Sequence, residues 1–360
     1  MTDLTSLKQR LHPALVQLAE GGPDELEERL SAIYAPDAQW RGSHPMNAAT
    51  GIGGIASTLW LPLFRAFPDL ERRDLIFVAG RSVHAPERPV RVAATGHLCG
   101  TWREPWLGIP PTGRVAVLRY GEVHEIDGQG RIARSTLILD VLDAMRQADH
   151  WPLQTSPAPE TTWLGPINGD GLRLDRAEEE EGEASIRQTL AMHGTLAAFD
   201  DKSVQGDPVR QREALRAMPQ REHWHERMMW YGPAGVGTTR GLAGFVDQHQ
   251  APFRVSFPGR RGGGTLLEEG DAEGGGHYLQ IGDGPYSVTG GWPSVRAMHD
   301  GGEWLGMAPT GRPIGMRVMD FYLHHEGLIR ENWVPIDVLD ILRQMGFDAM
   351  GWLARRTARP

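Results

Sequence analysis

Residues 304–312 read WLGMAPTGR, and residues 106–114 read WLGIPPTGR, so the chain carries nearly the same stretch twice. The two stretches begin 198 positions apart (304 − 106). Nearer the N-terminus, WYG at 230–232 matches WRG at 40–42, 190 positions apart (230 − 40). Self-similarity over such a distance is the sequence signature of a repeated structural unit. The chain is therefore predicted to contain two copies of one domain.

The change of spacing from 190 to 198 positions predicts a net insertion of eight residues in the second copy. The Gly-rich stretch between Gly262 and Gly276 is the natural place for it. A longer surface hairpin there would cost little free energy, because loop-closure entropy grows slowly with loop length.

The repeat gives the domain boundaries. We predict a first copy over 1–150, a linker over 151–183 and a second copy over 184–360. Four prolines and the acidic run EEEE at 178–181 lie between the copies. This composition is typical of a solvated spacer rather than of a packed core.

Within each copy, helical patterns come first and strand patterns follow. Leucines recur every three or four residues from Leu4 to Leu18, as an amphipathic helix requires, and an apolar helix is expected over 55–67. Period-two strands are predicted at 90–98, 114–126 and 132–139, before a last helix that begins at Asp140. The second copy repeats this order, with a helix over 185–199 and strands up to Pro335. The predicted class is α+β, a curved and mostly antiparallel sheet covered by N-terminal helices.

Composition excludes several partners. Acidic residues outnumber basic residues by 46 to 37, the net charge is −9, and no Lys/Arg stripe is present, so we expect no nucleic-acid partner. The apolar runs are far shorter than the roughly 20 residues that span a bilayer, so we expect no membrane partner. The N-terminus lacks the pattern of a signal peptide, and we expect a cytoplasmic protein.

The second copy resembles a known family. The stretch 304–312, the strand acid Asp320 and GLIRENW at 327–333 are similar to the SnoaL-like pattern of a Gly-Ile-Pro-Pro-Thr-Gly turn, a strand acid and a Gly-Lys-Ile-x-Glu-His-Trp strand. SnoaL-like proteins are the polyketide-cyclase-like branch of the nuclear-transport-factor-two-like fold. The resemblance implies two tandem cone-shaped domains that pair sheet to sheet as an intramolecular pseudo-dimer. The family's His is replaced by Asn332 in the second copy and by Ser135 in the first.

The candidate catalytic base is Asp320. In a strand it shares one face with Met316, Val318 and Tyr322, so desolvation in a cone would raise its pKa toward that of a general base. Glu122 occupies the same place in the first copy. The alternative is a buried carboxylate that a Tyr or Arg satisfies and that does no chemistry.

A second polar group would have to stabilise an enolate oxygen, and Asn332, Tyr322 and His299 are the candidates. Asp337 and Asp140 directly precede the closing helices and are expected to cap them. For Asp337, the resemblance also suggests a functional acid near this strand end.

The remaining candidates are ligand-binding tryptophans, namely Trp40, Trp230, Trp304 and Trp333. The first three are equally suited to stacking on a flat ligand and to filling the core. In the cluster at 223–226, His223 and His225 share a strand face and no third ligand is identifiable, so we predict no metal and no cofactor.

The resemblance implies cofactor-independent acid/base catalysis, an aldol cyclisation or isomerisation, on a small hydrophobic carbonyl compound. The alternative is a non-catalytic module that binds a small ligand or assists assembly. The second copy is the better candidate for the site, since it keeps Asp320, Asn332 and Trp333.

Overall fold

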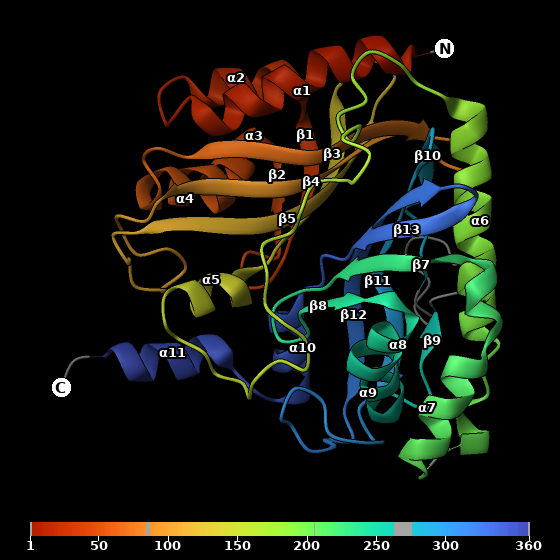
Figure 1. Cartoon of the computed structure of the whole chain (residues 1–360). Coiled ribbons are helices and arrows are strands. Elements are labelled where there is room, and N and C mark those ends of the chain that lie inside the picture. The colour runs from red at the N-terminus through yellow and green to blue at the C-terminus, as the bar shows by residue number, and fades with distance from the viewer. Residues whose placement is uncertain (1, 84–86, 205, 263–275, 359–360) are drawn as a thin grey trace.

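The two copies form two separate sheets that lie against each other (Figure 1). The computed structural model describes residues 2–83, 87–204, 206–262 and 276–358. The predicted eight-residue insertion falls on 263–275 and so lies outside the described residues. Among the residues that the structure describes, no helix is both long and apolar enough to cross a bilayer.

The first copy follows the predicted order of helices, strands and a closing helix. Its elements are α1 (Leu4–Glu20), α2 (Leu26–Ile33), β1 (Tyr34–Gly42), β2 (Ala48–Thr50), α3 (Gly51–Ile55), a π-helical turn (Ala56–Trp60), α4 (Leu61–Ala66), β3 (Glu71–Arg81), β4 (Val90–Thr101), β5 (Val115–Ile126), β6 (Ile132–Leu139) and α5 (Val141–Gln147). The leucines of α1 are buried at the predicted spacing, and Asp3 caps the helix by accepting a hydrogen bond from Thr5 N.

The second copy repeats this order with additional short helices. Its elements are α6 (Glu179–Ala197), a 3-10 turn (Asp201–Val204), α7 (Pro208–Ala217), a second 3-10 turn (Pro219–Glu222), β7 (Trp224–Tyr231), β8 (Thr238–Arg240), α8 (Gly241–Phe245), a π-helical turn (Val246–Gln250), α9 (Ala251–Ser256), β9 (Arg261–Gly262), β10 (Ile281–Asp283), β11 (Tyr286–Met298), β12 (Pro313–His325), β13 (Leu328–Trp333), α10 (Val338–Met345) and α11 (Ala349–Thr357).

Both sheets have the same strand order. From the equivalent edge, it is β2-β1-β6-β5-β4-β3 in the first copy and β8-β7-β13-β12-β11-β10 in the second. In the second copy β9 also pairs with β11. Only the β1–β6 and β7–β13 pairs are parallel among the described strand pairs. The α+β class and the mostly antiparallel sheets are therefore confirmed.

The repeated WLG stretch forms the same tight turn in each copy. The backbones of Trp304 and Met307 exchange two hydrogen bonds, and Leu305 and Gly306 between them have φ of 53° and 86°. Positive φ at both central residues is what a type I′ turn requires, and it explains the glycine.

The repeated Trp-x-Gly motif also has a steric origin. The Trp40 ring lies over Gly42, and a Cβ at Gly42 would overlap it. The same is true of Trp230 and Gly232. Each glycine therefore leaves room for a buried tryptophan at the end of β1 or β7.

The two sheets share a buried apolar cluster. The first copy contributes Ile76, Val78, Ala93, Val123 and Ile138, and the second contributes residues that include Met319, Phe321, Leu323 and Trp333. These side chains stand on the sheet faces that point away from each copy's own helices. The sheets consequently bury one face against each other and the other face in their own domain.

Buried polar contacts across the copies repeat with the same symmetry. Asp337 caps α10 and accepts a hydrogen bond from His44 N of the first copy at 2.8 Å. Asp140 caps α5 and accepts one from Ala234 N of the second copy at 2.9 Å. The predicted capping role of both aspartates is confirmed, and each also holds a backbone segment of the other copy.

The segment between the copies differs from the solvated linker that its composition predicts. Trp163 is buried between the sheets and donates a hydrogen bond to Gly232 O, and Arg173 is buried beside Asp283. α6 begins at Glu179, inside the acidic run, because carboxylates are favourable at the positive end of a helix. The segment is therefore only in part a solvated spacer, because Trp163 and Arg173 are buried while other residues, such as Leu164 and Ile167, are exposed.

Gly42→Ala should lower the free energy of unfolding by about 1–3 kcal/mol, since the new methyl group has to displace a buried indole. Gly53→Ala is the matched control in the same copy, because a Cβ at this helical glycine meets nothing within 4 Å. Chemical denaturation of both variants tests this, and equal stabilities would contradict the steric explanation.

Candidate functional site

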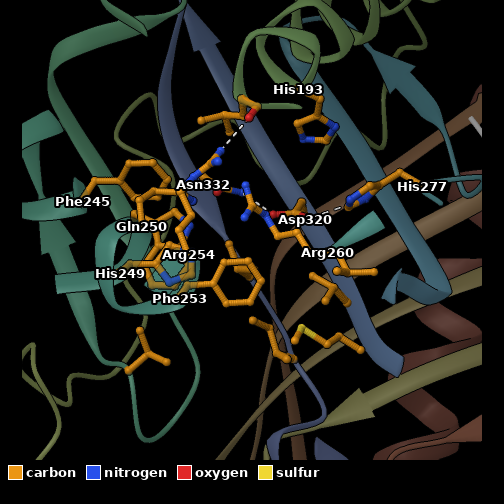
Figure 2. Close-up of a pocket in the computed structure, with 18 of the residues that line it drawn as sticks. His193, Phe245, His249, Gln250, Phe253, Arg254, Arg260, His277, Asp320 and Asn332 are labelled. Carbon is orange, nitrogen blue, oxygen red and sulfur yellow. Dashed lines mark hydrogen bonds and ion pairs between the residues drawn. The ribbon is translucent and has the colours of Figure 1, made fainter. Parts of the chain in front are cut away.

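The second copy encloses a cavity of about 160 Å³ between its sheet and its helices (Figure 2). Its apolar wall includes Met192, Leu196, Trp224, Trp230, Val236, Phe245, Phe253, Val295, Trp304, Met316 and Val318. Its polar groups are His193, His249, Gln250, Arg254, Arg260, His277, Asp320, Tyr322 and Asn332.

β12 carries Asp320 into this cavity. Val318, Asp320 and Tyr322 line it, while the alternating Met319 and Phe321 point into the cluster between the sheets. The predicted face of Asp320 is therefore the observed one. Burial raises the pKa of Asp320 to about 7, although hydrogen bonds from Asn332 and Tyr322 oppose the shift.

Two histidines flank this carboxylate. His277 Nδ1 lies 3.9 Å from Asp320 Oδ2, and His193 Nε2 lies 2.9 Å from the Tyr322 hydroxyl. The two imidazole rings are 4.8 Å apart. Burial lowers the pKa of His277 to about 4 and that of His193 well below its usual value, so both are neutral near pH 7. Asp320 therefore has neutral neighbours instead of a fixed countercharge.

Asn332 is a predicted partner that the structure places beside Asp320. Its Nδ2 donates to Phe321 O at 3.2 Å and lies 3.5 Å from Asp320 Oδ1. The Asp320 contact is long for a hydrogen bond, so this amide is held mainly by the backbone. Tyr322 remains a donor, because burial and the neighbouring Asp320 raise its pKa well above 10.

Among the predicted ligand-binding residues, Trp230 and Trp304 line the cavity and Tyr322 lies beside Asp320. The Trp230 ring stacks on His249 with a centroid distance of 4.1 Å. Trp304 packs edge-on against Phe257. Both tryptophans are nearly buried, so they close the cavity as core residues and present one ring surface to it.

Three predicted site residues of the second copy lie outside this cavity. Trp333 stacks on Tyr231 between the sheets, because it alternates with Asn332 along β13. His299 packs on Phe257 and contacts the Thr310 hydroxyl beside the repeated turn. Asp337 accepts hydrogen bonds at the interface of the copies, so its candidate catalytic role has no support from its position.

The first copy places Glu122 in an ionic cluster. Its carboxylate contacts Arg72 at 2.6 Å and His124 at 3.3 Å, and Arg72 also pairs with Asp74. Burial alone would raise the pKa of Glu122, but Arg72 and His124 lower it to about 2. The contact with Arg72 is the one that the alternative interpretation, a carboxylate satisfied by an arginine, predicts for Glu122.

The remaining first-copy candidate, Trp40, is buried over Gly42. It borders a different hollow, together with Tyr278 and Leu279 of the second copy. Trp40 is thus separate from the Asp320 site.

Six polar residues of the cavity wall were not predicted from the sequence, namely His193, His249, Gln250, Arg254, Arg260 and His277. They come from α6, the π-helical turn, α9 and two loops, and no short motif connects them. A histidine on the apolar face of a predicted helix was the one available signal, and it applies to His193. Among the described residues, no group of three His, Cys, Asp or Glu side chains is arranged to hold a metal ion.

Asp320→Asn should stabilise the protein at alkaline pH. The folded pKa of about 7 exceeds the usual 3.8, so the wild type loses stability as pH rises from about 4 to about 7. The difference amounts to as much as about 4 kcal/mol. The free energy of unfolding should be larger for the variant than for the wild type at pH 8, and this difference should be smaller at pH 5. A difference independent of pH would contradict the ionisation argument.

Glu122→Gln should have the opposite effect. The folded pKa of about 2 lies below the usual 4.5, so the carboxylate stabilises the protein above pH 4.5, and this stabilisation is lost as pH falls toward 2. At pH 8 the free energy of unfolding of the variant should be about 3–5 kcal/mol lower than that of the wild type, as expected for a broken buried ion pair. Denaturation curves with a wild-type midpoint would show that the pair contributes little.

The comparisons with known proteins agree with the sequence motifs. Residues 293–345 match the family model described as SnoaL-like polyketide cyclase. A search of the curated proteins found no match.

Similar solved structures include a SnoaL-like polyketide cyclase from Jannaschia sp. CCS1 (21% identity, 40% of this chain and 94% of that chain, TM-score 0.30). A second is AclR, described as a hydroxylase, from Streptomyces galilaeus (17% identity, 40% of this chain and 97% of that chain, TM-score 0.32). A third is IdmH, described as a polyketide cyclase, from Streptomyces antibioticus (21% identity, 38% of this chain and 97% of that chain, TM-score 0.29). The matched segment 293–345 contains Asp320 and Asn332, and the chain is a tandem protein whose second copy carries the SnoaL-like polyketide-cyclase sequence pattern.

Proposed function

We propose that the second copy catalyses a cofactor-independent proton transfer on a small hydrophobic carbonyl compound, with an aldol cyclisation or an isomerisation as the outcome. Asp320 is the general base. The first copy provides structural support.

The observation that carries this proposal is the environment of Asp320. Its carboxylate is buried in a mainly apolar cavity. Among the described residues, the one basic side chain within 4.0 Å of this carboxylate is His277, at 3.9 Å, and it is neutral near pH 7. A structural carboxylate would be expected to have a cation, as Glu122 has Arg72. A pKa of about 7 suits a base that must take up and return a proton near neutral pH.

The neighbouring groups support the remaining steps. Asp320 removes a proton from the carbon next to a carbonyl, and the Tyr322 hydroxyl donates to the developing enolate oxygen. The enolate carbon then attacks a second carbonyl carbon of the same molecule, and a C–C bond forms. The resulting alkoxide recovers the proton from Asp320. The reaction is balanced without an oxidant, a reductant or a metal ion.

The size of the cavity limits the substrate. A cavity of about 150 Å³ holds one benzene molecule in another protein, and the cavity here measures about 160 Å³. We therefore propose an open-chain or single-ring substrate rather than a polycyclic one.

We also propose that the two copies act as an intramolecular pseudo-dimer. The shared apolar cluster and the reciprocal Asp337–His44 and Asp140–Ala234 contacts support this arrangement. A buried sheet face in each copy is stabilised by the other copy.

Asp320→Asn should abolish turnover of heptane-2,6-dione, a small diketone that closes to a six-membered ring. Proton-transfer catalysis by a positioned base contributes about 10²–10⁴-fold, so we expect a loss of at least about 100-fold with little change in Kd. NMR of ring closure and of α-proton exchange in D₂O measures both steps. The rate of the wild type should rise with pH through about 7, because the base must be ionised.

Asp149→Asn is the matched control, since it neutralises an aspartate that is exposed on the surface, and it should keep the wild-type rate. Equal rates for the wild type and Asp320→Asn would remove Asp320 as the base. Binding without any turnover by the wild type would favour the non-catalytic binding module.

A further inference from the structure

A pair of arginines in the cavity wall shares a single carboxylate. Asp201 Oδ2 accepts hydrogen bonds from Arg254 at 3.1 Å and from Arg260 at 2.8 Å. Among the residues that the structure describes, Asp201 is the one acidic partner of either guanidinium. Two positive charges and one negative charge leave a surplus of one positive charge in this wall.

At least two carboxylates pair with each of three other buried arginines, namely Arg72, Arg119 and Arg173. Arg119 contacts Asp140, Asp143 and Glu160 within 3.6 Å, and its pKa is raised above the usual value despite its burial. At Arg254, burial and the neighbouring Arg260 lower the pKa to about 10, and Asp201 does not restore it. Within the described part of the chain, the arginine pair therefore has fewer carboxylate partners than Arg119 has.

Asp320 does not supply the missing charge. Burial, Asn332 and Tyr322 account for the pKa of Asp320, and neither arginine lowers it. Figure 2 shows Arg254, Arg260, His193 and His277 around the same pocket as Asp320. The cavity thus contains a cationic wall and a separate proton-transfer group.

The two guanidinium groups differ in burial and in the hydrogen bonds that they already make. Arg254 is nearly buried and is held by Asp201, Gln250 and Leu196 O, so it supplies mainly charge. The Arg260 side chain is 15% exposed and lies over the Phe253 ring, with the centroid 5.8 Å from its guanidinium carbon. A planar guanidinium matches the two oxygens of a carboxylate.

From this arrangement we propose that the cavity binds a keto acid, whose carboxylate contacts the Arg254–Arg260 pair while its ketone faces Asp320 and Tyr322. The inference rests on the proposed function, because it names the substrate class of the same site. It predicts that a carbonyl compound with one negative charge binds more tightly than an uncharged one of the same size.

The test compares 3-oxocyclohexanecarboxylate with its methyl ester, which has nearly the same shape and no charge. Calorimetry should show that the wild type binds the acid at least about tenfold more tightly than the ester, as expected for charge-assisted hydrogen bonds. Arg260→Gln should remove this preference, and Arg260→Lys should retain part of it. Arg227→Gln, at an arginine whose side chain is 70% exposed, is the matched control and should keep the full preference.

A second variant, with the opposite expected effect on binding of the acid, distinguishes a lost contact from misfolding. Asp201→Asn removes the carboxylate that competes with the ligand, so it should bind the acid more tightly than the wild type does. A damaged cavity cannot produce this gain. Equal binding of acid and ester by the wild type, or an unchanged preference in Arg260→Gln, would overturn the proposal.

The same ligands separate this inference from the proposed function. Asp320→Asn should keep the preference for the acid while α-proton exchange is lost. If the wild type prefers the acid but exchanges no proton, the anion site stands and the catalytic proposal fails. If exchange occurs equally with acid and ester, the catalytic proposal stands and the anion site fails.

Discussion

Strand β12 is buried on both of its faces, and the position of the candidate site depends on this constraint. Met319 and Phe321 fill the cluster between the two sheets, and Asp320 and Tyr322 point into the cavity. A shift of the strand by one residue would place the carboxylate among apolar side chains of the other copy. The apolar interface therefore fixes the strand register that places the desolvated carboxyl group of Asp320 in the cavity.

The two copies keep one backbone plan but differ in electrostatics. Glu122 and Asp320 occupy equivalent places, yet one pKa is lowered to about 2 and the other is raised to about 7. The cation that stabilises Glu122 is Arg72, and the residue 190 positions farther on is Gly262. Burial is common to both carboxylates, so the contrast comes from their partners: Glu122 has Arg72 and His124, and Asp320 has no guanidinium partner among the described residues.

The two buried acids therefore differ in their effect on stability. The first copy uses its buried acid in an ion-pair cluster with Arg72, Asp74 and His124. The second copy leaves its acid among neutral histidines and a tyrosine, which costs stability and leaves the group able to exchange a proton near pH 7. Proteins commonly accept such a cost at functional sites, where the rest of the fold offsets it.

The sequence by itself determined the repeat, the order of the elements, the side of β12 on which Asp320 lies and the caps at Asp140 and Asp337. These features follow from period, turn chemistry and local hydrogen bonds. Tertiary structure alone decided that Trp333 faces the other sheet, that Trp163 of the segment between the copies is buried between the sheets, and that His193, His277, Arg254 and Arg260 meet around one cavity. Contacts between residues far apart in the chain depend on how whole elements pack, and no local pattern encodes them.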